Sequence, residues 1–156
     1  MQIQLISVGV RMPAWVKGGF MEYARRLPQE CQLILREITP ARRGKSANVA
    51  QWRGDEGARI LAAVSENARV VALDVNGKLW TTHQLAETLQ RRMNSGDRVS
   101  LLVGGPDGLS PPCLARADET WSLSPLTFPH PLVRVIVAEQ IYRAWSLLHH
   151  HPYHRF

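Results

Sequence analysis

The chain carries five short segments of mostly apolar residues, which are typical of buried β-strands. A strand covered on both faces shows such continuous runs, whereas a strand wetted on one face alternates apolar and polar residues. The Asn76-Gly77 pair after the third segment is a turn signal, and we expect it to end that strand. The predicted strands are Ile3–Val8, Gln32–Ile38, Arg69–Val75, Val99–Val103 and Trp121–Leu123.

Segments with helical periodicity separate the predicted strands. The clearest helix start is Thr81-x-x-Gln84, a capping box in which the two residues satisfy each other's backbone N–H groups. The predicted helices cover residues 13–27, 47–64, the stretch from the capping box to near 96, a short piece after 111–112, and 131–148. This alternation predicts an α/β fold: one domain over residues 1–156, with a mostly parallel sheet of five to six strands and helices on both faces.

The composition is that of an ordinary globular protein, with 45% hydrophobic and 21% charged residues. No apolar run approaches the roughly 20 residues of a membrane span, and no basic region precedes the first apolar stretch. We therefore expect a cytoplasmic protein without a membrane anchor. Cys31 and Cys113 stand far apart and in no zinc-binding pattern, so we expect two free thiols.

Positive charge is concentrated in the N-terminal half of the chain. Residues 1–78 hold 12 Lys and Arg against seven Asp and Glu, whereas residues 79–156 hold seven against six. A basic lobe beside a nearly neutral one favours a polyanionic partner, because phosphate neutralisation supplies most non-specific affinity for nucleic acid. Arg42, Arg43 and Lys45 are the candidate phosphate contacts. The alternative is an arginine-rich surface that only contacts water.

Two irregular loops follow the last two predicted strands, at the edge where open α/β sheets bind their ligands. The first, Gly104–Gly108, matches neither of the common phosphate-binding glycine motifs. The second contains no ionisable side chain over Leu123–Phe128, and it offers backbone groups, two small hydroxyls and apolar walls. Such a surface suits a flat heteroaromatic ring and suits a pyrophosphate poorly.

Several segments closely resemble the RlmH family, SPOUT-class methyltransferases that modify a pseudouridine in large-subunit ribosomal RNA. The similar stretches are IQLISVG, MPAWVKGGFMEYARRLP, ARRGKSAN, VSLLVGGPDGLSP, WSLSPLTFPHPLVRVIVAEQIYRAW and HPYHR, which together cover nearly the whole chain. The PHPLVR and HPYHR segments are the specific ones, since a glycine turn alone is common.

The resemblance implies a deep trefoil knot, in which the C-terminal segment threads back through the loops after the fourth and fifth strands. It also implies a homodimer that uses S-adenosylmethionine to methylate N3 of a pseudouridine in 23S rRNA of the assembled ribosome. The cofactor contacts carried over are Leu73, Gly104, Leu123, Ser124, Pro125, Leu126, Thr127 and Phe128. We expect the backbone at Gly104 to approach the cofactor closely.

The methyl acceptor must lose its N3 proton, so the site needs alignment and help with that proton. His130 can accept a proton near neutral pH, and Arg155 can hold charge developing on the carbonyl oxygens. With Tyr153 they are the candidate catalytic residues. His154 is a further candidate for RNA contact, and the resemblance also places Glu139 and Arg143 near the substrate. The simpler alternatives are a turn-capping histidine and a surface ion pair.

The polar, aromatic tail lies beyond the final helix, where a monomer would leave it frayed. We therefore predict an active site shared across a two-fold dimer, with one subunit supplying its tail to the cofactor loops of the other. Consecutive histidines at 149–151 point in different directions, so we expect no metal. Two alternatives remain: a non-catalytic RNA-binding protein of the ribosome and a small α/β protein that binds a nucleotide or flavin.

Overall fold

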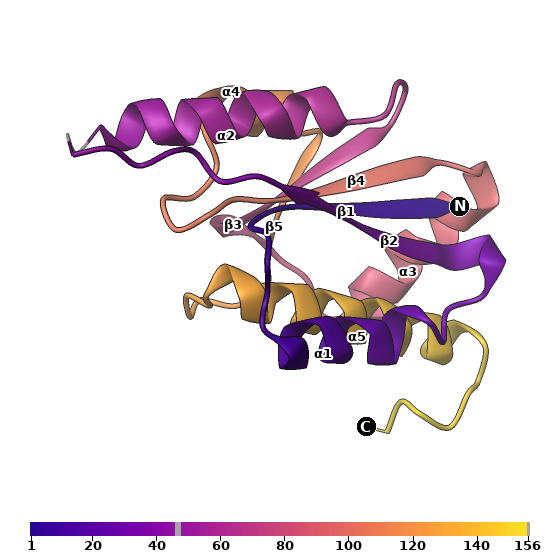
Figure 1. Ribbon diagram of the computed structural model, residues 1–156. Helices are drawn as coiled ribbons and strands as arrows, with labels where there is room; N and C mark the ends of the chain where they lie inside the picture. Colours follow the sequence, from indigo (N-terminus) through magenta and orange to yellow (C-terminus); the bar gives the residue numbers. More distant parts are fainter. Residues whose placement is uncertain (46–47, 156) are drawn as a thin grey trace.

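A parallel β-sheet forms the centre of the computed structural model, which describes residues 1–45 and 48–155. The strand order is β2-β1-β4-β3-β5, and every pair of neighbouring strands is parallel (Figure 1). The strands are β1 (Gln2–Val8), β2 (Gln32–Ile38), β3 (Arg69–Leu79), β4 (Arg98–Val103) and β5 (Glu119–Ser122). The predicted α/β class and the position of all five strands are confirmed.

Helices cover both faces of the sheet, with α2 and α4 on one face and α1, α3 and α5 on the other (Figure 1). They are α1 (Ala14–Ala24), α2 (Val49–Ala63), α3 (Thr82–Ser95), α4 (Pro111–Arg116) and α5 (His130–Leu148), with a short 3-10 turn at Gln29–Cys31. The capping box before α3 forms as predicted. The predicted start of the second helix at residue 47 lies outside the described residues, and Asn48 caps α2.

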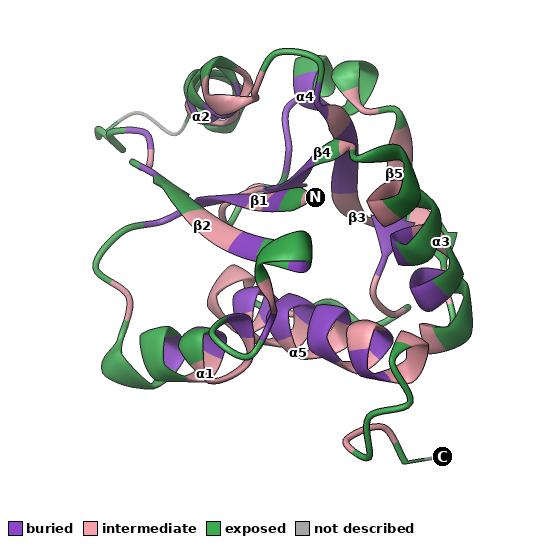
Figure 2. Cartoon of the chain, turned by 90° about the vertical axis from the view of Figure 1, so that its right-hand side faces the viewer, coloured by how far each residue is buried: buried purple, intermediate pink, exposed green. Residues whose placement is uncertain are grey.

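Strands β1 and β4 are mostly buried, as their apolar runs predict, whereas the edge strand β2 is partly exposed (Figure 2). In β4, Leu101 and Val103 join the cluster under α1, α3 and α5, whereas Leu102 joins the cluster under α2 and α4. Gly57 brings α2 close to α4, because a Cβ there would lie 2.1 Å from the Ser110 hydroxyl oxygen. The sheet is therefore held between two separate apolar layers.

Helix α5 packs against both α1 and α3, so it runs beneath the sheet after leaving β5 at the sheet's edge. It approaches α1 closely at Gly19, where a Cβ would lie 3.1 Å from the side chain of Val135. The trefoil knot that the resemblance implies stays a prediction. Among the described residues, no helix is both long and apolar enough to cross a membrane.

Strand β3 is longer than the sequence predicts, and the expected strand end at Asn76-Gly77 is wrong. Leu73 pairs with Trp121, and after a register shift Lys78 pairs with the same residue. Residues 74–77 therefore leave the ladder as an excursion, after which the chain rejoins β5. A Cβ on Gly77 would lie 2.8 Å from the backbone of Thr120 and Trp121, so this close return requires glycine.

Both cysteines are free, as predicted, and both are fully buried. Burial raises the pKa of the Cys31 thiol to about 12 and also raises the pKa of Cys113. Such thiols stay protonated at neutral pH, so they act as small apolar core residues rather than as nucleophiles.

A buried charge joins helix α5 to the ends of two strands. The side chain of Arg134 is 1% exposed and forms an ion pair with Glu37 Oε2 of β2 at 2.8 Å. It also donates hydrogen bonds to the Gly9 carbonyl at 2.9 Å and to Ser7 Oγ at 3.3 Å. The guanidinium is thus satisfied by three partners next to the carboxyl end of β1.

Replacing Arg134 by methionine should lower the free energy of unfolding by at least about 2 kcal/mol. The change removes three hydrogen bonds and leaves the buried Gly9 carbonyl without its donor. The matched control is Arg25→Met, since the side chain of Arg25 is 65% exposed and pairs with Glu22 at the surface. That change should cost less than about 1 kcal/mol. Urea unfolding measures both, and equal small losses would show that the buried network does not stabilise the fold.

Candidate functional site

The middle of β3, at the start of its excursion, and the carboxyl ends of β4 and β5 surround a cavity of about 670 Å³. Seven of the eight residues that the resemblance assigns to the cofactor line it, and Pro125 does not. The seven are Leu73, Gly104, Leu123, Ser124, Leu126, Thr127 and Phe128. They come from three separate segments, so the parallel sheet brings them together at one edge, as expected for open α/β folds. Their role in cofactor binding stays a prediction.

The glycine turn after β4 forms one wall of the cavity. A Cβ on Gly104 would lie 2.4 Å from the backbone carbon of Gly108, and Gly108 has a φ of +79°. Both glycines are therefore required by the turn itself. The expected close approach of the Gly104 backbone to the cofactor stays a prediction.

The loop after β5 forms the opposite wall and is organised by its own hydroxyls. Ser124 Oγ accepts the backbone N–H of Leu126 at 3.0 Å, and Ser122 Oγ donates to the Ser124 carbonyl at 3.0 Å. Leu126 is 70% exposed and lies at the cavity, where its side chain can cover an apolar ligand. The loop thus presents apolar surface, hydroxyls and backbone groups, which suits an uncharged aromatic ring.

His130 begins helix α5 and lines the same cavity. Its Nδ1 is buried and has no hydrogen-bond partner among the residues that the structure describes. Burial lowers the pKa of His130 below its ordinary value, and the positive charge of Arg134 lowers it further. The imidazole is therefore neutral at pH 7, which is the form that accepts a proton.

The sequence pattern predicts no role for three residues that are important in this region. Asp74 lines the cavity from the excursion in β3, and its position directly after Leu73 is the signal that could have identified it. Arg134 lies within the PHPLVR segment, but burial of its charge is visible only in the fold. Glu56 is 1% exposed in α2 and accepts the backbone N–H of Ala41 at 3.0 Å. Nothing in the helical pattern distinguishes it from a surface residue.

The C-terminal tail is docked on its own helix, so the expected frayed tail is wrong. Tyr153 donates its hydroxyl to Glu139 Oε1 at 3.0 Å, and its ring lies 4.7 Å from that of Tyr142. The guanidinium of Arg143 lies 5.2 Å from the Tyr153 ring centre and pairs with Glu139 at 2.7 Å. Desolvation, followed by the hydrogen bond to Glu139, raises the pKa of Tyr153, so its hydroxyl stays protonated.

The three candidate catalytic residues do not meet within one chain. His130 begins α5, whereas Tyr153 and the exposed Arg155 lie beyond its C-terminal end. A helix of 19 residues is about 28 Å long. The structure does bring Tyr153, Glu139 and Arg143 together, and His154 Nδ1 lies 3.2 Å from Ser146 Oγ on the same part of the helix. Within one chain, the candidate residues therefore form two groups at opposite ends of α5.

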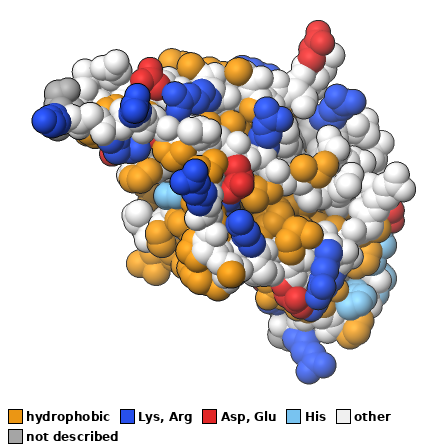
Figure 3. Space-filling view, viewed as in Figure 1, with side chains coloured by type: hydrophobic (Ala, Val, Ile, Leu, Met, Phe, Trp, Pro, Cys, Tyr) orange, Lys and Arg blue, Asp and Glu red, His pale blue; other side chains and the backbone are white. Residues whose placement is uncertain are grey.

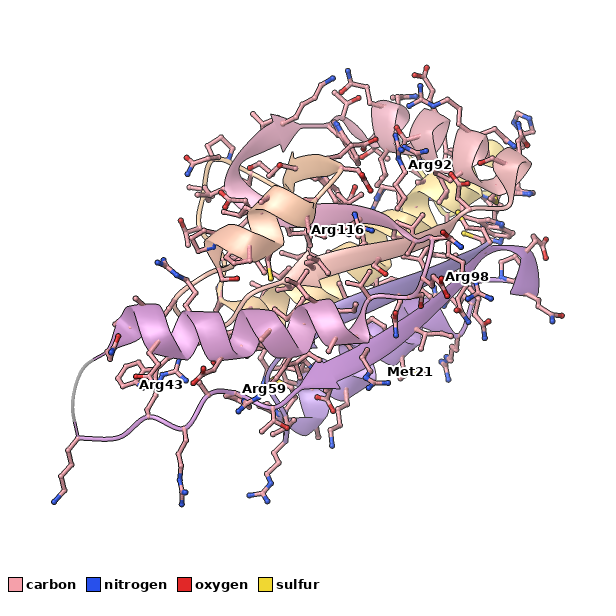
Figure 4. The ribbon with its side chains drawn as sticks, turned by 90° about the horizontal axis from the view of Figure 1, so that it is seen from above. Met21, Arg43, Arg59, Arg92, Arg98 and Arg116 are labelled. Atoms are coloured by element: carbon pink, nitrogen blue, oxygen red, sulfur yellow. The ribbon has the colours of Figure 1, made fainter. Side chains whose placement is uncertain are left out.

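The basic loop before α2 differs from a uniform phosphate-binding surface. Arg42 and Lys45 are exposed, but Arg43 pairs with Asp107 at 2.8 Å and with Glu56 at 3.4 Å. Arg43 lies beside the start of α2 (Figure 4). It thus links the loop to the glycine turn. Figure 3 shows Lys and Arg side chains spread over the face that carries α2 and this loop.

The histidines at the C-terminal end contact side chains and backbone of neighbouring residues in the same chain. The His149 ring stacks on Trp145, with 4.6 Å between centres, and His151 Nδ1 accepts the backbone N–H of Tyr153. Within residues 1–45 and 48–155, no group of three or more His, Cys, Asp or Glu is arranged to hold a metal ion.

Comparisons with known proteins agree with this architecture. A family model described as "Predicted SPOUT methyltransferase" matches residues 1–154. A protein from Methylococcus capsulatus named "Ribosomal RNA large subunit methyltransferase H" is 61% identical over 155 residues, which are 99% of this chain and 100% of that one. Proteins of the same name from Nitrosococcus oceani and Thioalkalivibrio sulfidiphilus are each 59% identical over 155 residues, covering 99% of both chains.

Solved structures support the fold independently of sequence. A probable methylase family protein from Haemophilus influenzae aligns with a TM-score of 0.54 at 9% identity, covering 99% of this chain and 70% of that one. TrmJ from Z. mobilis aligns with a TM-score of 0.53 at 17% identity, covering 93% of this chain and 70% of its own. On the matched family model and the full-length relatives, the chain belongs to the ribosomal RNA large subunit methyltransferase H family of SPOUT methyltransferases.

Proposed function

We propose that this protein is an S-adenosylmethionine-dependent methyltransferase that methylates N3 of a pseudouridine in 23S rRNA, acting as a homodimer on the assembled ribosome. Family membership supports the rRNA methyltransferase activity. The observation that carries the cofactor assignment is the convergence of seven expected contact residues, from three separate segments, on one cavity.

The cavity fits the chemistry of this cofactor. Its lining is mainly apolar, with hydroxyls at Ser122, Ser124 and Thr127, and the described residues that line it include no lysine or arginine. S-adenosylmethionine has an adenine, a ribose and a sulfonium but no phosphate, so it needs apolar walls and backbone hydrogen bonds rather than cations. When bound, it supplies the methyl group as an electrophile. The loops after β4 and β5 would hold it, with Leu126 covering one side.

The chain's own residues supply alignment and proton handling. His130 is a neutral imidazole at the cavity and is suited to accept the N3 proton of the acceptor base. Arg155 carries a positive charge suited to the anion that forms on the acceptor's carbonyl oxygens. The Glu139–Arg143 pair fixes the ring of Tyr153, which offers an aromatic face for the extruded base.

A two-fold dimer would unite the two separated groups of candidate residues. A closed two-fold arrangement allows the tail of one subunit to face the cavity of its partner, and the reverse contact forms the second site. The docked tail supports this arrangement, since the partner would receive an ordered Tyr153 rather than a flexible end.

The proposed function is tested by isothermal titration with S-adenosylmethionine and by transfer of labelled methyl groups to ribosomes that lack the modification. The wild type should bind the cofactor and label 23S rRNA. Thr127→Arg should abolish both, because the exposed Thr127 lines the cavity and arginine adds bulk and positive charge there. Ser95→Arg at the far end of α3 is the matched control and should leave both unchanged. A wild type that binds ribosomes without binding the cofactor would instead support a non-catalytic RNA-binding protein.

The shared site predicts complementation between two inactive subunits. A Thr127→Arg subunit keeps its tail, and a subunit truncated after His151 keeps its cofactor loops, so a mixed dimer of the two should retain one working site. Methyl transfer by co-expressed, doubly tagged dimers measures this, and both parent homodimers should be inactive. If the mixed dimer is inactive while each subunit folds, the tail does not act on the partner's cavity.

The basic loop predicts a salt-dependent contribution to ribosome binding. Neutralising the exposed Arg42 and Lys45 to glutamine should lower the slope of log affinity against log salt concentration by roughly two units, about one per lost phosphate contact. Arg98→Gln is the control, because Arg98 is the first residue of β4 and lies at the amino ends of the parallel strands, whereas the basic loop follows the carboxyl end of β2. An unchanged slope in the double variant would assign these two side chains to an ordinary hydrated surface.

A further inference from the structure

The cavity has an unusual charge for this protein. Asp74 is the one side chain with a formal charge at neutral pH among the described residues that line it. His130 is neutral there, and lysine and arginine are absent from the lining. The whole chain carries a net charge of +6, so an acidic cavity runs against the overall charge. This local sign favours a cationic ligand over a neutral one.

The fold holds Asp74 firmly at this position. The register shift between β3 and β5 expels residues 74–77 from the ladder, and Gly77 returns the chain against the backbone of β5. Within the excursion, Asp74 Oδ1 accepts the backbone N–H of Asn76 at 2.8 Å. The carboxylate is therefore oriented by its own loop through one oxygen, and its other oxygen has lone pairs that can accept from a further partner.

Methyl transfer changes one charge on the cofactor. The bond between sulfur and the methyl carbon breaks with its electron pair remaining on sulfur, the bond between N3 and that carbon forms, and the N3 proton leaves to a base. The cofactor therefore changes from a sulfonium cation to a neutral thioether, S-adenosylhomocysteine. Adenine, ribose and the amino-acid end are the same in both molecules.

We infer that Asp74 makes the cavity selective for the sulfonium cofactor over the thioether product. The inference rests on the proposed function and deepens it by naming a residue that sets specificity. A fixed carboxylate in a partly enclosed cavity attracts the positive charge of the sulfonium, and this attraction disappears once the methyl group has left. Product release is thereby favoured without a loss of affinity for the reactant.

A carboxylate at the end of a strand can also bind ribose hydroxyls, as acidic residues do in dinucleotide-binding folds. That role would contribute equally to both forms of the cofactor, because their riboses are identical. The ratio of the two dissociation constants therefore separates charge selection from sugar binding.

The test uses Asp74→Asn in the full-length protein, with titration calorimetry of S-adenosylmethionine and of S-adenosylhomocysteine. Asparagine retains an oxygen that can accept the Asn76 N–H, so the variant removes the charge while preserving the loop contact. S-adenosylmethionine should bind about tenfold more weakly, which corresponds to about 1.4 kcal/mol. S-adenosylhomocysteine should change by less than about twofold.

Two further variants control for other effects. Asp107→Asn removes the same charge from the neighbouring glycine turn, where Asp107 pairs with Arg43 and does not line the cavity. It should leave the ratio of the two dissociation constants unchanged. Asp74→Glu keeps the charge and alters the loop contact, so it should retain most of the preference for the sulfonium form.

Each outcome decides the inference. A ratio that falls about tenfold in Asp74→Asn alone, and is largely kept in Asp74→Glu, supports it. Equal weakening or loss of both ligands in Asp74→Asn overturns it in favour of sugar binding or a structural role, as does an equal change of ratio in Asp107→Asn. A wild-type protein that binds neither ligand overturns the proposed function itself, and the inference with it.

Discussion

The buried guanidinium of Arg134 is the interaction on which the arrangement of the site depends. It joins the first turns of α5 to Glu37 of β2 and to the Gly9 carbonyl just beyond β1. A buried charge tolerates few alternative positions, because every other placement leaves it or its partners without hydrogen bonds. Helix α5 therefore starts at a defined place beneath the strand ends. This also fixes the positions of the loop after β5 and of the His130 ring.

A parallel sheet and one irregularity then build the cavity. Parallel strands place the loops after β4 and β5 at the same edge of the sheet. The glycine turn is compact because Gly104 and Gly108 lie so close together that a Cβ on Gly104 would clash with the Gly108 backbone. The excursion of residues 74–77 adds a third wall and brings the carboxylate of Asp74 to the cavity. An apolar cavity with a single negative charge suits a ligand that is mostly apolar and carries one positive centre.

The length of α5 imposes a different constraint. The helix spans the sheet, so its first residue borders the cavity while its last turns hold Tyr153 against Glu139 and Arg143. A single subunit cannot bend this helix to bring the two ends together. The tail is nevertheless ordered by aromatic and ionic contacts on its own helix. In the proposed dimer, a preorganised tail would suit insertion beside the partner's cavity, because little further ordering would be needed on assembly.

The sequence alone determined much of the fold. Mostly apolar segments located the five strands, because strands covered on both faces contain few polar residues, and the Thr81–Gln84 capping box located a helix start. The resemblance named seven residues that do meet at one cavity, among them Gly104 and Phe128. The strands and the helix start are local features of the chain, so a local pattern predicts them, whereas the site residues came from the resemblance.

Only the tertiary structure decided which charges are buried, paired or facing the cavity. Arg43 and Arg42 are neighbours in the sequence, but Arg43 pairs with Asp107, 64 residues away, while Arg42 remains exposed. The turn signal at Asn76-Gly77 indicated the end of a strand, whereas pairing with β5 continues the strand beyond it and places Asp74 at the cavity. The physical reason is that burial, ion pairing and strand register depend on residues distant in the chain, and no local pattern records them.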